Sequence, residues 1–415
     1  MVVGTELFGL LREKHGDGFQ QFVDDKVAAL AGDIVYENLG LEAPLLDKLA
    51  KEMDVIVNIA ATTNFYERYD VSLDVNVMGA PVPLRQAMYQ AQDAHACLHS
   101  YVSDNKEGLI LEKPIKPGET APGRHLPRHR RRAAARQGRQ EGAQAQRPRR
   151  PQQDGEEGHE GARPPKKARH FGWSNTYVFT KAMGEMLLGE LLGDMPAVIM
   201  RPSIITSVMA DPLPGWMQGT RTIDTLIIGY AKQNLSCFLG DLSVVPDVIP
   251  GDMVVNAMLA AMVVHSGERG APPPVYHATS SLRNPTTYGV IYQAGQRYFY
   301  QNPRVGENGE VIPTKEMHLF TTMASLHLYM MLTYKLPLEQ KPKYDDEFVM
   351  RFADVYAPFA FFKGCYDDMN LERLRLKMAM KTPEDRMFNF DPKTIDWEEY
   401  FYRIHIPGVL KYVCK

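Results

Sequence analysis

The amino-acid sequence predicts an α/β fold, in which a doubly wound parallel sheet is followed by a mainly helical C-terminal region. Two short apolar runs rich in Val and Ile, Met53–Ala61 and Pro196–Ser203, are typical of strands buried on both faces of a parallel sheet. Helical patterns such as Val82–Gln92 lie between them, and this alternation favours a doubly wound sheet. From about Thr314 to Lys415 the chain is rich in aromatic residues and helical in pattern, which predicts a second, helical domain.

The composition limits the class of protein. A chain of 415 residues predicts two or three domains, and a net charge of −3 argues against a protein built to bind polyanions. The four cysteines lack metal-type spacing, so we predict a reducing compartment and no metal site. The apolar run Met253–His265 is too short to cross a membrane and predicts a buried helix. Mixed charges near the N-terminus argue against a secretory signal peptide.

Polar residues follow both predicted strands. Thr62–Asn64 comes directly after the first strand, and Arg201–Ser203 ends the second. Doubly wound sheets bind their ligands at the carboxyl ends of the strands. We therefore expect a ligand site where these two polar segments meet.

A Tyr and a Lys lie four residues apart at the start of a predicted helix. Ser174 or Asn175 can cap a helix that begins near Thr176. The i,i+4 spacing lets the Tyr177 hydroxyl and the Lys181 ammonium reach one ligand, and a nearby ammonium favours tyrosinate. Such a Tyr can donate a proton to a carbonyl oxygen as hydride arrives at carbon. The alternative is an ordinary surface Tyr and Lys, since the motif is short.

The helical pattern assigns two faces to this helix. Its buried stripe is predicted to contain Phe179, Met183, Met186 or Leu187, and Leu191. The opposite face would carry Tyr177, Lys181, Gly184 and Leu188.

The stretch before this helix has a different composition. From Pro127 to His170 the chain contains no Val, Ile, Leu, Met, Phe, Tyr, Trp or Cys, so we expect it to be disordered. Translation in a shifted reading frame explains it best, because permitted codons for His125–Gly138 and Glu156–Pro164, read one base later, encode helix-like patterns. A genuine linker and an arginine-rich nucleic-acid-binding arm are the alternatives. The arm lacks interleaved aromatic residues for base stacking.

Motifs along nearly the whole chain, except Ala121–Lys167, resemble one family. They include "LFGLLREKHG", "GDIVYENLGL", "DVIVNIAATTNFYERYDVSLDVNVMGA", "EGLILEKP", "FGWSNTYVFTKAMGEMLLG", "VIMRPSIITS", "PGWMQGTRTIDTLIIGY", "DVIPGDMVVNAM", "SSLRNP" and "FDPKTIDWEEYF". The chain resembles the plant alcohol-forming fatty acyl-CoA reductases, the male-sterility type of extended short-chain dehydrogenase/reductase. The resemblance implies a Rossmann-type sheet followed by the family's helical C-terminal domain.

The resemblance also implies an activity. Members of the family use NADPH to reduce a long-chain acyl-CoA to a primary fatty alcohol through an aldehyde. We expect an acyl-CoA substrate, no nucleic-acid partner and an intracellular location, at the endoplasmic reticulum surface or in the plastid, and peripheral membrane association is compatible with the family. The alternatives are a catalytically dead or mis-annotated member of the family and, less favoured, a nucleic-acid-binding protein.

The resemblance assigns roles to individual residues. Tyr177 would donate the proton, Lys181 would hold the nicotinamide ribose and tune Tyr177, and Ser100 would bind the substrate carbonyl. The remaining cofactor-binding residues would be Asp33 and Ile34 near the adenine, Ala60, Ala61 and Thr62 along the cleft, Asn76 bracing the central strands, and Pro202 and Ser203 beside the nicotinamide. A turn residue is the alternative for Asp33, and a polar residue on a helix face is the alternative for Asn76.

Three departures from the family pattern stand out. The sequence contains no glycine-rich turn whose backbone amides would meet the cofactor pyrophosphate, so we expect the first βαβ unit to be missing and NADPH binding to be weak. The segment "LHSYVSDNKEG" is about three residues short of the family pattern, and Ser100 is the remaining candidate there. The third departure is the basic stretch. The predicted organisation is therefore a partial NADP-binding domain (1–120), a basic insert (121–169), the rest of the Rossmann and substrate region (170–307) and a helical domain (308–415).

Overall fold

A computed structural model describes most of the chain outside the basic stretch. The described residues are 2–64, 67–78, 95–99, 107–116, 168, 170–191, 196–220, 222–232, 235–266, 268, 272–306, 308–335, 349, 350, 353, 356, 357, 359–378 and 388–414. The predicted helix Val82–Gln92, Ser100 and almost all of the predicted insert lie outside them. No described helix is long and apolar enough to cross a bilayer.

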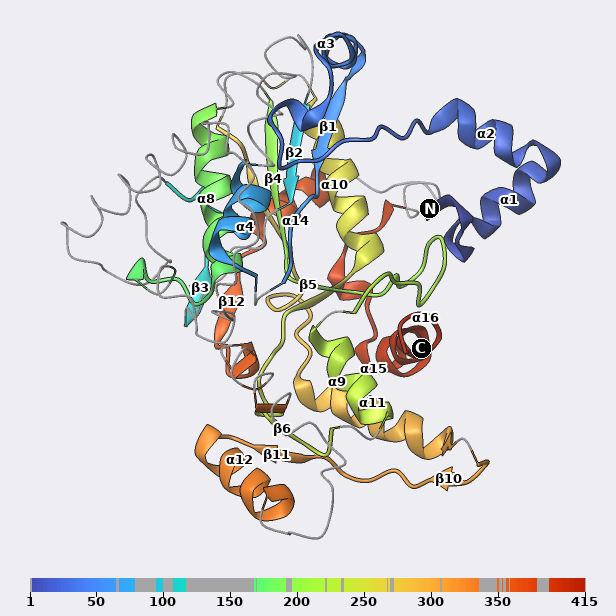
Figure 1. The fold of residues 1–415 in the computed structure, drawn as a ribbon, viewed down its shortest axis with the longest axis vertical. Coiled ribbons are helices and arrows are strands. Elements are labelled where there is room, and N and C mark those ends of the chain that lie inside the picture. Colours follow the sequence, from blue (N-terminus) through green and yellow to red (C-terminus); the bar gives the residue numbers. More distant parts are fainter. Residues whose placement is uncertain are drawn as a thin grey trace, which may run out of the picture.

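A parallel sheet forms the centre of the molecule (Figure 1). Its strands are β1 (Val55–Asn58), β2 (His95–His99), β4 (Ala197–Pro202) and β8 (Val275–Ala278), hydrogen-bonded in the order β1-β2-β4-β8. All three pairings are parallel, and Val57 lies opposite Cys97, which lies opposite Val198. Every residue of β4 is buried, as the apolar run predicts.

The first predicted strand is less buried than expected. Val55 and Val57 of β1 are 43% and 41% exposed. Among the described residues β1 pairs with β2 alone, so it stands at the edge of the sheet. The prediction of a strand within Met53–Ala61 is therefore confirmed, whereas the prediction that this strand is buried on both faces was wrong.

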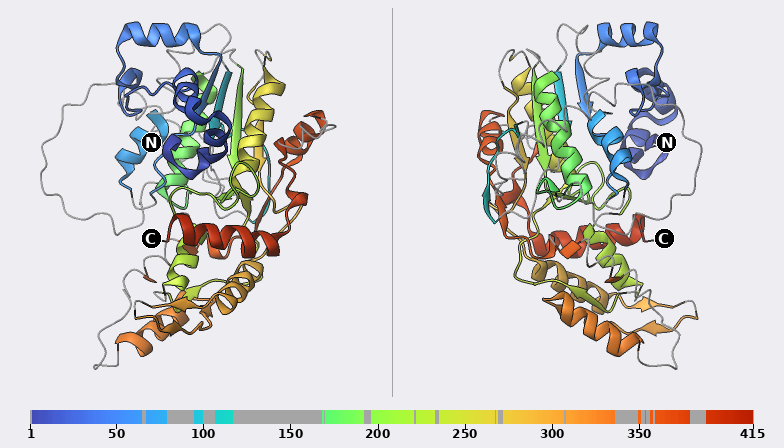
Figure 2. Two further views of the ribbon diagram at one scale, coloured as in Figure 1. Left: turned by 90° about the vertical axis from the view of Figure 1, so that its right-hand side faces the viewer. Right: turned by 60° about the vertical axis from the view of Figure 1, so that its left-hand side comes forward.

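Helices cover both faces of the sheet, as expected for a doubly wound fold (Figures 1 and 2). Helix α8 (Thr176–Leu191) lies on one side and α10 (Gly251–His265) on the other. The helix predicted at Met253–His265 is confirmed, but it is buried on one face. Val255, Leu259 and Val263 recur at i,i+4 spacing on its exposed face.

Short helices precede the sheet. They are η1 (Val2–Gly4), η2 (Glu6–Phe8), α1 (Gly9–His15), η3 (Gly16–Gly18), α2 (Phe19–Lys26), η4 (Glu37–Gly40) and α3 (Ala43–Glu52). Helices α1 and α2 pack through stacked rings of His15 and Phe22, whose centroids are 4.0 Å apart. Glu6 accepts hydrogen bonds from Lys411 and Tyr412, so this segment lies against the C-terminal helix.

Two short turns of helix follow β1. They are α4 (Tyr69–Leu73) and the π-helical turn η5 (Asp74–Met78), and both pack against α8. The segment carries Asn76 to the face of α8 that bears Thr180.

A second lobe lies beyond the carboxyl ends of the strands (Figure 1). It contains β5 (Ile204–Thr206), α9 (Thr222–Ala231), β6 (Cys237–Leu239), β7 (Val248–Pro250), α11 (Tyr288–Gln301), β9 (Arg304–Val305), β10 (Val311–Ile312), β11 (His318–Phe320), α12 (Met323–Met330) and the π-helical turn η7 (Met331–Lys335). The stretch from His318 to Phe320, which the pattern predicts as helix, is instead a strand. It pairs in parallel with β6, a partner far away in sequence.

The C-terminal residues pack on the first lobe and then, near the end of the described chain, on α9 and α11 of the second lobe. β12 (Gly364–Tyr366) pairs with β3 (Gly108–Ile110), and α14 (Met369–Met378) packs on α10 and β8. The chain ends with η9 (Pro392–Thr394), α15 (Trp397–Glu399), the π-helical turn η10 (Tyr400–His405) and α16 (Ile406–Tyr412).

One apolar core joins this C-terminal part to the sheet. Phe401, Ile406 and Val409 are fully buried in the same cluster as Met200 of β4 and Met253 of α10. A Cβ on Gly408 would lie 2.1 Å from the carbonyl oxygen of Gly215, so the two backbones touch. The described parts of the predicted domains 170–307 and 308–415 thus share a core, and the predicted division stays a prediction.

Candidate active site

Helix α8 begins where its capping residue predicts. The Asn175 side-chain oxygen accepts a hydrogen bond of 2.9 Å from the backbone N–H of Val178, three residues into the helix. This bond satisfies one of the free N–H groups at the helix start. Of the two predicted caps, Asn175 is therefore the one that acts, and Ser174 hydrogen-bonds the Asn175 side chain.

Tyr177 and Lys181 lie one turn apart near this end of α8, and both are buried. Their exposed fractions are 8% and 5%. An ammonium group is rarely buried unless it has a partner or a function. The alternative of a surface Tyr and Lys is therefore wrong. The predicted stripe is less buried than expected, since Met183 and Met186 are only partly buried, whereas the opposite face with Tyr177 is buried. Leu188 on the same face is 1% exposed.

Aromatic residues just before α8 explain this burial. Phe171 and Trp173 are buried in one cluster with Ile115, Tyr177 and Phe179. Ala168, the described end of the predicted insert, is also buried in this cluster.

Asn76 joins the loop after β1 to the second turn of α8. Its amide oxygen accepts the backbone N–H of Thr62 at 2.9 Å, and its amide nitrogen donates to the Thr62 carbonyl at 3.3 Å. The same nitrogen donates to the Thr180 hydroxyl at 3.1 Å. Thr180 stands directly before Lys181, so Asn76 fixes the distance between the strand end and the Tyr177–Lys181 pair.

Close packing reinforces this link. A Cβ on Gly184 would lie 2.6 Å from the backbone carbonyl oxygen of Asn76. Real Cβ atoms do not approach so closely, and a larger residue would push α8 away from η5.

Burial changes the acidity of Lys181. Loss of solvent around the ammonium lowers the pKa of Lys181 to about 8, while the negative charge of Glu185 one turn later raises it in part. The balance leaves an ammonium that loses its proton far more readily than an exposed lysine does.

Glu185 in turn belongs to a buried ion pair that the sequence interpretation missed. Arg201 of β4 donates to both carboxylate oxygens of Glu185, from Nε at 3.0 Å to Oε2 and from a terminal nitrogen to Oε1. The two side chains are 7% and 1% exposed. The backbone N–H of Ile115 also donates to Glu185 at 3.1 Å. A pair with this geometry is the bidentate form that suits a buried carboxylate.

The ion pair continues into a wider polar cluster. Arg201 lies 3.2 Å from His277 Nε2, and His277 Nδ1 lies 2.7 Å from the Asp367 carbonyl. Burial and the Arg201 charge lower the pKa of His277 to about 3, so this ring is neutral at physiological pH. Glu112 accepts the backbone N–H of His277 at 2.8 Å, and burial raises the pKa of Glu112 to about 7.

One feature of the sequence could have indicated this polar cluster. Arg201 stands inside an apolar run predicted to be buried, and a buried arginine requires an acidic partner. The pattern does not say which acid, because Glu112 and Glu185 lie in other segments.

The second predicted strand end also lies in a polar site. The backbone N–H of Ser203 donates to the Ala278 carbonyl at 3.0 Å, at the ends of β4 and β8. Asp247, fully buried nearby, accepts the backbone N–H groups of Ser280 at 2.9 Å and Ser281 at 3.3 Å. Burial raises the pKa of Asp247 despite these bonds. Pro202 is the last residue of β4, so both predicted nicotinamide neighbours lie at the carboxyl end of this strand.

The remaining predicted site residues differ in their placement. Ala60 follows β1, where its N–H donates to the Asn58 side chain at 3.1 Å, and Ala61 leads to Thr62. Asp33 and Ile34 lie in a turn before η4, where the Asp33 carboxylate accepts the N–H of Val35 at 2.9 Å. In the described part of the chain Asp33 makes local hydrogen bonds, which favours the turn-residue alternative. Ser100 lies outside the described residues.

The site has groups suited to the nicotinamide ribose of a dinucleotide. Lys181 offers a buried ammonium beside the loop after β1. The amide nitrogen of Asn58, at the end of β1, is buried and has no hydrogen-bond partner among the described residues. A ribose hydroxyl or carboxamide oxygen would satisfy the Asn58 donor, so the residues present fit this end of the cofactor.

Comparison with solved structures defines the class of fold. The terminal reductase domain from the myxalamid biosynthetic pathway matches with a TM-score of 0.55 and 13% identity, covering 94% of this chain and 76% of that chain. The reductase domain of a non-ribosomal peptide synthetase from Mycobacterium tuberculosis matches with a TM-score of 0.53 and 14% identity, over the same shares of both chains. The protein therefore shares the Rossmann-type fold of these domains, as predicted.

Sequence comparison identifies the family. Two family models, both described as male sterility protein, match residues 6–258 and 323–415. Fatty acyl-CoA reductase 1 of Arabidopsis thaliana is 41% identical over 100% of this chain and 88% of its own length. The alcohol-forming fatty acyl-CoA reductase of Simmondsia chinensis is 39% identical over 99% of this chain and 87% of its own length. The chain belongs to the male sterility family of fatty acyl-CoA reductases, which confirms the resemblance found in its motifs.

Proposed function

We propose that the protein reduces long-chain acyl-CoA to a primary alcohol with NADPH as the reductant. The observation that carries the proposal is the burial of Tyr177 and Lys181 on successive turns of α8, held beside the end of β1 by Asn76. Membership of the reductase family supports the substrate class. The choice of NADPH over NADH follows the family resemblance.

NADPH, when bound, would supply one hydride to the thioester carbonyl carbon and a second NADPH would supply one to the resulting aldehyde. In each reduction Tyr177 would donate its phenolic proton to the carbonyl oxygen, and solvent would return the proton to Tyr177. The first reduction gives a hemithioacetal. When its C–S bond breaks, the hydroxyl loses its proton and the departing sulfur takes up one, which releases CoA thiol and leaves the aldehyde. Lys181 would hold the ribose and favour the ionised form of Tyr177 between proton transfers.

The test is a product assay on the purified chain. Long-chain acyl-CoA is supplied with NADPH or with NADH, and the products are extracted and identified by gas chromatography and mass spectrometry. We expect a primary alcohol, two NADPH oxidised for each alcohol formed, and lower rates with NADH. Release of CoA thiol without aldehyde or alcohol would contradict reduction and would indicate a thioesterase instead.

A further inference from the structure

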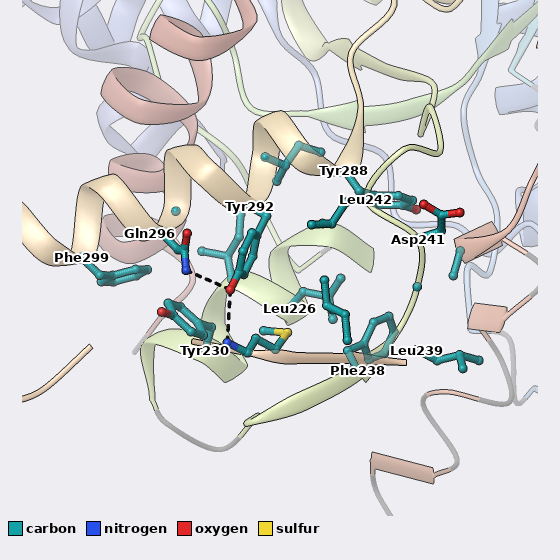
Figure 3. A pocket seen from close by; sticks show the side chains of 17 residues that line it. Leu226, Tyr230, Phe238, Leu239, Asp241, Leu242, Tyr288, Tyr292, Gln296 and Phe299 are labelled. Atoms are coloured by element: carbon teal, nitrogen blue, oxygen red, sulfur yellow. Dashed lines mark hydrogen bonds between the residues drawn. The ribbon is translucent and has the colours of Figure 1, made fainter. Parts of the chain in front are cut away.

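An apolar cavity of about 100 Å³ lies in the second lobe (Figure 3). Its walls come from α9 and α11, from β6 and from the chain that follows β6. Leu226, Ile227, Phe238 and Ile291 are among its lining residues. The lobe lies beyond the carboxyl ends of the sheet strands (Figure 1).

Several polar groups at the cavity already have hydrogen-bond partners, and the Asp241 carboxylate accepts the N–H and the hydroxyl of Ser243 at 2.8 and 2.7 Å. The Tyr292 hydroxyl accepts the side-chain N–H of Gln296 at 2.9 Å and the backbone N–H of Met317 at 3.3 Å. The Tyr230 hydroxyl donates to the Lys315 carbonyl at 2.6 Å. The rings of both tyrosines therefore line the cavity while their hydroxyls are engaged elsewhere. A ligand that fills this space has to be hydrocarbon.

A glycine stands in the middle of the α11 wall. The residues of α11 that line the cavity recur at helical spacing on one face: Tyr288, Ile291, Tyr292, Gly295, Gln296 and Phe299. A Cβ on Gly295 would meet no atom of the described residues within 4 Å. The same holds for Gly240 on the β6 side of the cavity. The absence of side chains at Gly240 and Gly295 thus leaves space open in the cavity.

We propose that this cavity receives the terminal methyl end of the acyl chain and that Gly295 and Gly240 determine the chain length accepted. The proposal rests on the proposed function, which supplies the acyl ligand. An engineered apolar cavity of about 150 Å³ binds one benzene molecule, so this cavity of about 100 Å³ has room for only a few carbons. It therefore receives the end of a long chain and not the whole of it.

The test changes the depth of the cavity from both directions. Gly295→Leu and Gly240→Val should fill it, while Ile291→Ala should enlarge it. Gln293→Leu is the matched control, because Gln293 is exposed on α11 and does not line the cavity. Binding of a series of saturated acyl-CoAs, in steps of two carbons, is measured by calorimetry with each variant, alongside the product assay.

We expect Gly295→Leu to weaken binding of the longest acyl-CoA that the wild type accepts by about tenfold or more, since each methylene in an apolar pocket is worth roughly that factor. Acyl-CoAs shorter by about four carbons should keep their affinity, and Ile291→Ala should shift the preference towards longer chains. Leucine favours helix over glycine, and melting temperatures check that each variant folds.

The outcomes separate the two proposals. An unchanged length profile in Gly295→Leu and Gly240→Val, or an equal shift in Gln293→Leu, overturns the chain-length assignment. A shifted binding profile with no reduced product supports the assignment and overturns the proposed function. Failure of the wild type to bind any acyl-CoA overturns both.

Discussion

Asn76 donates a hydrogen bond of 3.1 Å to Thr180, and this contact joins η5 to the helix that carries Tyr177 and Lys181. Because the Thr180 hydroxyl also donates back to the helix carbonyls of Thr176 or Tyr177, at 2.9 and 3.1 Å, the contact is tied to the backbone of the first turn. Movement at the end of β1 is therefore transmitted to the base of α8. The geometry of the candidate site thus depends in part on a polar contact between two elements far apart in sequence.

Replacement of Tyr177 by Phe should remove the proton donor and leave the ring packed in its cluster. Loss of a positioned acid typically costs about 10²–10⁴-fold in rate. The measurement is kcat for acyl-CoA reduction, with NADPH affinity and melting temperature as controls that should change little. Retention of more than about a third of the rate would mean that Tyr177 is not the acid.

Replacement of Lys181 by Met should stabilise the protein without its cofactor and abolish reduction. The pKa of Lys181 falls from 10.5 in the unfolded chain to about 8 in the folded one, so the folded state binds fewer protons between these values. Below pH 8 the buried charge therefore costs stability, and the cost disappears as the pH rises towards 10.5. We expect a gain on the order of 1 kcal/mol in urea unfolding at pH 7, which shrinks in alkali. A gain that does not change with pH would contradict this origin.

The Glu185–Arg201 pair should behave as a unit. Arg201→Met leaves the Glu185 carboxylate buried without its cation, which typically costs about 3–5 kcal/mol. Glu185→Gln likewise leaves the Arg201 guanidinium buried without its anion. The double variant removes both charges, so no buried charge lacks a partner. In a double-mutant cycle by urea unfolding we expect the double variant to be more stable than the sum of the single losses predicts. Strict additivity would show that the pair is not coupled.

Glu112 should make stability depend on pH. Its pKa rises from 4.5 to about 7 on folding, so the folded state binds more protons between these values, and its contribution to stability falls as the pH rises from 4.5 to 7. Glu112→Gln cannot titrate. The difference in unfolding free energy between wild type and variant should therefore change across this window and be flat above it. His277 titrates in the wild type and in Glu112→Gln alike, so its contribution cancels when the two unfolding free energies are subtracted.

Gly184→Ala should destabilise the protein, because its Cβ would lie 2.6 Å from the Asn76 carbonyl oxygen and α8 would have to move. The matched control is Gly295→Ala in α11, where the space is open and alanine is favoured over glycine by about 1 kcal/mol. Melting temperatures should fall for Gly184→Ala and rise for Gly295→Ala. Equal shifts would show that the contact with Asn76 is not tight.

Local patterns in the sequence predicted local structure well. The apolar run around Val198 gave a buried strand, and Asn175 gave the helix start, because strand burial and capping are decided by a few neighbouring residues. The placement of Asn76 beside Thr62 also agrees with the bracing role that the family resemblance implies, although that role stays a prediction.

Long-range partners could not be predicted in this way. Glu112, Glu185, Arg201 and His277 lie in four separate segments, and no spacing in the sequence connects them. The burial of Lys181 was missed for a related reason. Helical periodicity identifies one apolar face of a helix. The other face of α8, which bears Tyr177, is buried by Ile115, Phe171 and Trp173, and these residues precede the helix. The strand at His318–Phe320 was missed because its partner, β6, is distant in the chain.

The burial of Tyr400, Phe401, Ile406 and Val409 in the core beneath β4 and α10 has a consequence for synthesis of the protein. A ribosome delivers these residues after the strands of the sheet and the helices α8 and α10. Until they leave the exit tunnel, the apolar side chains of Met200 and Met253 that they cover stay open to water and to other nascent chains. This core therefore cannot close until the residues from Tyr400 to Val409 have been synthesised, and a chain interrupted before Tyr400 would expose apolar surface to the chaperones that bind new proteins.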